Sequence, residues 1–484
     1  MSMSKPLLNG RGWLAGTRVV VLLVIGILWA LPATARDRHV ILIGTVDAPK
    51  DFETGLFVGD VERLHDVLDK LWNDPAALGL TSSSATIRLA ANAIYRLDPT
   101  KWEEGRVRLA LGTAMQGGNQ YTDDRDEDGN PGPDGIPDAI DIDERGNKTF
   151  ASQQTIIDGR GLTGERAVIE AGRENTIYNL TVWGARDPVP GGTNRPGAEI
   201  RLLLTDHDDV GRLTVDGVIC EKGRRGLHVS SANGALMDLT ARRSIFRDHA
   251  DPMDFAWGVQ VFTRNFSEHS VTLHHNRISN NRIGIFLASV GVRDGELLLN
   301  SHHNVIEENN IGIQSLIRDF NSPEGSLRNH TQIHSTTDMI WNNRMGGGVL
   351  AVSYQRDANG IEIRDNATEL QFWETRFVKL TASGEFDGLQ NRRANRRVDL
   401  RMVGAILATP ELTGPTSGMS VKLLLRQTTS SLLPTDYDPA PQPIVIEDNA
   451  PEEVDITIIG SQKAYLRTNE GVNELDESLF SRGR

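Results

Sequence analysis

The chain of 484 residues is poor in cysteine and in aromatic residues, with one cysteine and 6% Phe, Trp and Tyr. A single thiol, Cys220, cannot form an intrachain disulfide, so packing must stabilise the fold even in an oxidising compartment. Positive charge is also scarce, since the chain has 51 Lys and Arg residues and 65 Asp and Glu residues, which gives a formal charge of -14. This balance argues against a nucleic-acid partner, and an anionic polysaccharide would need local cations or bridging metal ions.

Long apolar runs are missing after the first 31 residues. Val19 to Leu31 is too short to favour a transmembrane helix, and it follows basic residues and precedes Ala33-Thr34-Ala35. Residues 1–35 are therefore predicted to be a signal peptide, with an uncleaved anchor as the alternative. They hold three positive charges and no acid, so their removal makes the formal charge more negative by three. We expect a secreted or periplasmic protein that has no membrane span after cleavage.

What the sequence does contain is a repeat: the stretch 271–313 carries one phrase twice, at an offset of about 28 residues. Short alternating apolar runs separated by Asn and Gly are typical of one coil of a β-solenoid, in which each coil buries its inward side chains on its neighbours. The matching pairs are His274 and His302, His275 and His303, Asn276 and Asn304, Ile278 and Ile306, Asn281 and Asn309, Ile283 and Ile311, Gly284 and Gly312, and Ile285 and Ile313.

One helix is predicted before the coils begin. Asp60 can cap its first turn, apolar residues follow at helical spacing from Val61 to Leu71, and Asn73-Asp74-Pro75 ends it. A solenoid has an open apolar end, and a short amphipathic helix at residues 60–72 can cover it.

The strand patterns resemble those of a known superfamily. Residues 86–121 resemble the first coils, and Thr155 to Gly159 is similar to a phrase of the first full coils, of the right-handed parallel β-helix proteins of the pectate-lyase-like superfamily. The resemblance implies an all-β, right-handed parallel β-helix solenoid with an N-terminal capping helix. The expected organisation is a signal peptide at 1–35, an N-terminal segment with the helix at 36–85, the β-helix at 86–385 with an acidic insertion at 123–144, and irregular final coils and a tail at 386–484.

The acidic insertion holds ten carboxylates and one cation between Asp123 and Glu144. Aspartates at alternate positions before a glycine provide the oxygen ligands that a hard cation needs. The segment is not an EF-hand, because Gly135 stands where the twelfth-position Glu is required, but it resembles thrombospondin type 3 calcium repeats. The predicted calcium ligands are Asp124, Asp126, Asp128, Asp134 and Asp138; the alternative is an acidic loop without an ion.

Other repeated residues have structural and functional interpretations. The histidine pairs at 274–275 and 302–303 would stack on adjacent coils, either as a structural ladder or as a group that binds a transition metal or relays protons. The asparagines of the repeat are expected to form turn ladders. Four tryptophans could stack on sugar rings or anchor loops: Trp183, Trp257, Trp341 and Trp373.

The candidate site lies in the interval from Phe246 to Trp257, which is long where its neighbours are short. In the repeat register this turn shares an edge with Glu221 to Arg225 and with Asn280 to Arg282. Carboxylates gathered there beside arginines would supply acid and base groups for cleaving a polysaccharide; the alternative is a solvated loop. The proposed catalytic residues are Glu221, Asp248, His249, Asp251 and Asp254.

Two functions remain open from the sequence. The superfamily is rich in lyases and hydrolases of acidic polysaccharides, so the resemblance implies an exported enzyme of lyase or glycoside hydrolase type, with polysaccharide as its partner. Fold does not fix function, however. The alternative is a non-catalytic surface or adhesion protein that binds glycan or protein along its long face. The sequence does not indicate an oligomeric state.

Overall fold

We describe a computed structural model of the chain. The described residues are 39–118, 154–162, 167–184, 197–205, 209–249, 256–264, 266–290, 294–318, 326–327, 329–341 and 343, and beyond these the strands between 348 and 482. The predicted signal peptide and the acidic insertion lie outside them. None of the helices among the described residues is long and apolar enough to cross a membrane.

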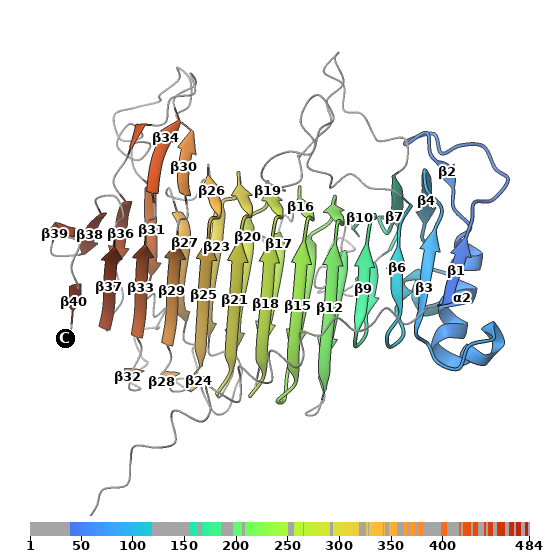
Figure 1. The fold of residues 1–484 in the computed structure, drawn as a ribbon, viewed down its shortest axis with the longest axis horizontal. Helices are drawn as coiled ribbons and strands as arrows, with labels where there is room; N and C mark the ends of the chain where they lie inside the picture. The colour runs from blue at the N-terminus through green and yellow to red at the C-terminus, as the bar shows by residue number, and fades with distance from the viewer. Residues whose placement is uncertain are drawn as a thin grey trace, which may run out of the picture.

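Three long β-sheets run the length of the molecule (Figure 1). Sheet 1 contains β1 (His39–Ile43), β3 (Ala85–Leu89), β6 (Ala114–Gln116), β9 (Asn175–Tyr178), β12 (Val210–Asp216), β15 (Leu236–Arg242), β18 (Glu268–His274), β21 (Glu296–His302), β25 (His330–Thr336), β29 (Ala367–Trp373), β33 (Ser420–Arg426), β37 (Glu453–Ile459) and β40 (Phe480–Arg482).

Sheet 2 contains β2 (Phe57–Val58), β4 (Ala93–Arg96), β7 (Thr155–Asp158), β10 (Thr181–Trp183), β13 (Ile219–Glu221), β16 (Ile245–Arg247), β19 (Arg277–Ser279), β22 (Val305–Glu307), β26 (Met339–Trp341), β30 (Arg376–Leu380), β34 (Thr429–Leu433) and β35 (Ala440–Pro441).

Sheet 3 contains β5 (Val107–Arg108), β8 (Ile169–Ala171), β11 (Ile200–Leu204), β14 (Arg225–Ser231), β17 (Trp257–Thr263), β20 (Ile283–Val290), β23 (Ile311–Arg318), β27 (Gly348–Gln355), β31 (Val398–Val403), β36 (Ile444–Asp448), β38 (Ala464–Thr468) and β39 (Gly471–Leu475). Strands β24 (Ser326–Leu327), β28 (Ile363–Arg364) and β32 (Thr416–Ser417) form a small fourth sheet.

The chain visits sheets 1, 2 and 3 in turn, so each coil adds one parallel strand to each sheet. Only the last strands pair antiparallel among the described residues: β34 with β35, β37 with β40, and β38 with β39. The predicted all-β right-handed parallel β-helix with an N-terminal capping helix is confirmed. The sheets extend on both sides of residues 86–385, because β1 already pairs with β3 ahead of this range.

The repeat of the sequence is the repeat of the structure. Ile278 pairs with Ile306 and then Ile340 on successive coils of sheet 2, and all three side chains are fully buried. His274 likewise lies beside His302 in sheet 1. The inward side chains of all three sheets form one continuous apolar core, which is how a solenoid without disulfides gains its stability.

Helix α2 (Val61–Asn73) covers the N-terminal end of this core (Figure 1). The carboxylate of Asp60 accepts a hydrogen bond from the Arg63 backbone N–H at 2.9 Å, the predicted N-cap. Leu64, Leu68 and Leu71 are buried in the same cluster as the inward residues of the coils. Two 3₁₀ helices, η1 (Pro75–Leu78) and η2 (Trp102–Gly105), complete the helical elements.

The corners between the sheets are sharp turns supported by buried amides. At the corner from sheet 2 to sheet 3, Asn281 donates through Nδ2 to Asn309 Oδ1 at 3.0 Å, and Asn309 donates in the same way to Asn343 at 3.1 Å. At the corner from sheet 1 to sheet 2, Asn276, Asn304 and Asp338 form a second ladder. The predicted amide ladders are therefore present.

Candidate functional site

A row of polar and aromatic side chains follows the outer surface of sheet 2. Its members point outward at the same register position on successive short strands. Strand pairing aligns Arg96, Asp158, Trp183, Glu221, Arg247, Ser279 and Glu307. We call these seven residues the outer row. Neighbouring members are separated by the spacing of adjacent β-strands, about 4.8 Å.

The N-terminal end of the outer row is a network of ion pairs. Arg96 donates to Asp158 at 2.5 Å and to Asp51 at 2.8 Å. Arg160, which follows Asp158 in the next turn, donates two hydrogen bonds to Glu53 at 2.7 and 2.6 Å. These bonds from Arg160, aided by Arg96, lower the pKa of Glu53 to about 2 although partial burial opposes the shift. Glu53 therefore stays ionised at neutral pH and holds the guanidinium groups of Arg160 and Arg96 in place.

Trp183 is enclosed by cations and does not offer a free ring face. Its ring is fully buried, with the Lys222 ammonium 3.4 Å and the Arg160 guanidinium 4.4 Å from the ring centroid. Burial lowers the pKa of Lys222, and the nearby Glu221 carboxylate partly opposes this shift. The indole N–H donates to Glu221 Oε1 at 2.9 Å. Trp183 therefore positions charged neighbours through cation–π contacts rather than serving as a stacking surface for sugar.

Two of the predicted site residues meet at Arg247. Its guanidinium donates to Glu221 Oε2 at 2.9 Å through Nε and lies 3.7 Å from Asp248 Oδ2. Glu221 is buried, whereas 47% of the Asp248 side chain is exposed. Asn280 on the next coil donates to Asp248 Oδ1 at 2.6 Å. The shared edge predicted from the repeat register thus brings Glu221, Asp248 and Asn280 together around one arginine.

His249 lies inside the corner instead of facing outward with Asp248. Its backbone N–H and its Nδ1 both contact Asn281 Oδ1, at 3.3 and 2.6 Å, so the ring occupies the next position of the asparagine ladder. Because Asn281 Oδ1 can only accept, Nδ1 carries a hydrogen. Nε2 then faces Glu199, 3.2 Å from its Oε2, and neither side chain is exposed. We call these two residues the buried pair.

Glu199 stands where the following coils have glycine. Pairing of β11, β14, β17, β20 and β23 aligns it with Gly226, Gly258, Gly284 and Gly312. Its carboxylate fits because Gly184 and Gly223 have no side chain: a Cβ on either residue would lie 2.2 or 2.0 Å from Glu199 Oε1. The corner is therefore shaped to hold one carboxyl group against one imidazole.

The pKa values of both members of the buried pair are raised, for different reasons. Burial raises the pKa of Glu199, and the nearby His249 only partly opposes this. Burial alone would lower the pKa of His249, but the Glu199 carboxylate and the Asn281 carbonyl raise it above its ordinary value. Both pKa values are thus raised, which favours retention of a proton by the pair.

The other arginines and aspartates of the prediction lie elsewhere. Asp251 and Asp254 fall outside the described residues. Arg224 is buried, and Arg225 lies over the Trp257 ring, 4.8 Å from its centroid. Arg277 on β19, which has no distinguishing pattern in the sequence, donates to Glu307 of the next coil at 2.5 Å.

Comparison with known proteins finds similarity in the fold. No family model and no curated protein matches the chain. Among solved structures, the A-module of the mannuronan C-5 epimerase AlgE6 of Azotobacter vinelandii is 14% identical over 84% of this chain and 97% of its own, with a TM-score of 0.36. The AlgE4 A-module of the same organism is 13% identical over 87% and 95%, with a TM-score of 0.35. The catalytic domain of a GH87 α-1,3-glucanase is 11% identical over 90% of this chain and 66% of its own, with a TM-score of 0.30.

Proposed function

We propose that this protein binds a polysaccharide along the outer surface of sheet 2 and acts on it chemically beside Arg247. The outer row is the observation that carries the proposal. Its carboxylates Asp158, Glu221 and Glu307 are buried and its arginines Arg96 and Arg247 are partly exposed, so the row holds guanidinium groups along one line. Cations aligned in this way suit a linear polymer whose anionic groups recur along its length.

The cations of this surface favour an acidic polymer. Arg96, Arg247 and Arg277 are each partly exposed, with 43, 20 and 20% of the side chain accessible. A guanidinium has five N–H donors, so one that holds a protein carboxylate can still donate to a carboxylate of the ligand. These arginines provide local cations on a chain whose overall charge is negative.

The reaction we propose is acid–base chemistry at the glycosidic bond or at the carbon next to a uronate carboxyl group. Asp248, with Asp251 and Asp254 shortly after it in the sequence, would give or take the proton. Arg247 would neutralise the substrate carboxylate, and Glu221 would hold Arg247. Lyase chemistry then uses one carboxylate as the base, and hydrolysis uses two carboxyl groups as acid and base or nucleophile.

The test uses purified full-length protein with a panel of polyuronates and neutral glucans. We expect turnover on a polyuronate, detected as unsaturated ends by ultraviolet absorbance or as new reducing ends. Asp248→Asn keeps the side-chain size and should lower turnover by about 100-fold or more. Asp238→Asn is the matched control, because Asp238 is also half exposed and pairs with an arginine, Arg212, on sheet 1. Equal activity of the two variants and of the Asp251→Asn/Asp254→Asn double variant would contradict the catalytic proposal.

The second candidate function is glycan binding without catalysis, which the dense pairing of the outer row favours. In that case no polymer of the panel is cleaved, but Arg96→Gln weakens binding to immobilised polyuronate while Arg212→Gln does not. Binding that is indifferent to Arg96 would exclude the outer row as the binding surface.

Two further proposals concern residues outside the described part of the chain. We propose that residues 1–35 direct export, and that calcium is bound by Asp124, Asp126, Asp128, Asp134 and Asp138. The support for both lies in the sequence: the apolar run with its small-residue cleavage site, and the alternate aspartates before glycine.

A further inference from the structure

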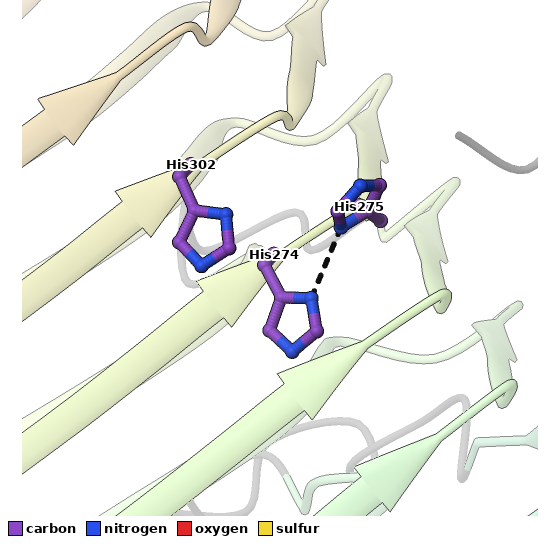
Figure 2. A group of neighbouring side chains, drawn as sticks. All are labelled: His274, His275 and His302. Carbon is purple, nitrogen blue, oxygen red and sulfur yellow. Dashed lines mark hydrogen bonds between the residues drawn. The ribbon is translucent and has the colours of Figure 1, made fainter. Parts of the chain in front are cut away.

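Four histidines gather at the corner from sheet 1 to sheet 2 on two adjacent coils. His274 and His302 end β18 and β21 and are paired in register. His275 and His303 follow them in the left-handed conformation, with φ of 55° and 54°. The imidazoles of His274, His275 and His302 lie close together on the outside of the coil (Figure 2). We call the four residues the histidine corner.

The rings of the histidine corner form two parallel stacks. His274 lies over His302 and His275 over His303, each with ring centroids 4.9 Å apart and interplanar angles of 7° and 0°. Within each coil the two Nδ1 atoms approach each other, at 3.0 Å between His274 and His275 and 3.2 Å between His302 and His303. Two nitrogen ligands on a tetrahedral zinc ion, each about 2.0–2.1 Å from the metal, are roughly 3.3 Å apart. Both pairs are therefore spaced as metal ligands are.

The backbone of this corner does not require histidine. The same two positions hold Arg242 and Arg243 on the preceding coil and Thr336 and Thr337 on the following one. Arg243 and Thr337 adopt the same left-handed conformation, with φ of 48° and 55°. The turn therefore forms with other side chains, and the convergence of imidazole nitrogens needs a separate explanation.

Charged groups also lie near the histidine corner. Of the facing cations, Arg242 and Arg243 are both paired with Asp216.

We propose that the histidine corner binds one divalent transition-metal ion of the zinc, nickel and copper class. His274, His275 and His302 supply the first three nitrogens, which lie within 4.8 Å of one another and close on the ion by rotation of half-exposed side chains. A water molecule would complete a four-coordinate site. Imidazole ligands select these ions over calcium and magnesium, which prefer oxygen. This site is thus separate from the proposed calcium segment and from the outer row.

The test is calorimetric titration of zinc into the full-length chain without an affinity tag, first stripped with chelator. The buffer contains millimolar calcium, so that carboxylate sites are already occupied. We expect saturable binding of about one zinc ion per chain, weakened at least tenfold in His274→Gln and in His302→Gln. His330→Gln, which removes a part-buried histidine at the other end of β25, should bind zinc like the wild type.

A second measurement separates ligand loss from misfolding. Cobalt bound to the wild type should give visible d–d absorption typical of a four-coordinate site, and His302→Gln should lose it while keeping the wild-type melting temperature in chelator. Absence of saturable zinc binding by the wild type would overturn the proposal. So would zinc affinity that is unchanged in both His274→Gln and His302→Gln.

Discussion

The pair of Glu199 and His249 shows how one residue position can change the physical behaviour of a corner. Both groups have folded pKa values above their ordinary values, so the stability they contribute is present at low pH and is lost as pH rises. Above an ordinary histidine pKa of about 6.5 the unfolded chain releases a proton that the folded pair keeps. The free energy of unfolding should then fall by up to about 1.4 kcal/mol per pH unit until the pair also releases it.

Glu199→Gln tests this proton. A glutamine can donate to the neutral Nε2 of His249 without sharing a proton, so the variant should lose the pH dependence above the ordinary histidine pKa of about 6.5 and gain relative stability at the alkaline end. Urea unfolding at several pH values measures the difference between variant and wild type. A constant difference across this range would mean that the pair binds no extra proton when folded.

At the scale of elements, the asparagine ladder fixes the corner between sheets 2 and 3. Asn309 Oδ1 accepts from the Asn281 backbone N–H at 3.0 Å, and its Nδ2 donates to the Ile278 carbonyl at 3.0 Å. Asn309→Ala leaves both groups buried without these partners, each at about 1–3 kcal/mol. We expect urea unfolding to show that this variant loses roughly 3 kcal/mol of its free energy of unfolding. The control Asn73→Ala, at an exposed residue of helix α2, should lose less than about 0.5 kcal/mol. Similar losses in both variants would contradict the ladder's role.

The difference between inward and outward positions explains which parts of the structure the sequence could predict. Inward isoleucines such as Ile278 and Ile306 recur at a fixed interval because each must fill the same core position, so the coil, its register and the capping helix were predictable. Outward positions do not have to fill the same core position on every coil. The outer row of Arg96, Asp158 and Trp183 therefore looked like ordinary alternation, and the approach of Glu199 to His249 was missed. The sequence does hold one indication of this approach: Glu199 occupies the position that is glycine on the following coils, at Gly226, Gly258, Gly284 and Gly312.

For the whole molecule, stability is distributed along a stack in which each coil contacts mainly its neighbours. The outer row and the histidine corner involve contacts between adjacent coils, and the buried pair reaches across the intervening coil at Gly226. A change that loosens one coil is thus expected to disturb the sites on the coils next to it. An ion that binds only the folded chain should therefore stabilise the neighbouring coils as well as the loop that holds it.

Calcium provides the corresponding test on the full chain. Binding at Asp124, Asp126 and Asp128 only in the folded state would stabilise by about 2.7 kcal/mol at a calcium concentration 100-fold above the dissociation constant. We expect the melting temperature to rise with calcium and to fall again with chelator, and Asp126→Asn to weaken the response. Asp47→Asn removes the same charge from an exposed position and should leave the calcium response intact. A melting temperature indifferent to calcium and chelator, with no heat of binding, would show that the acidic segment holds no structural ion.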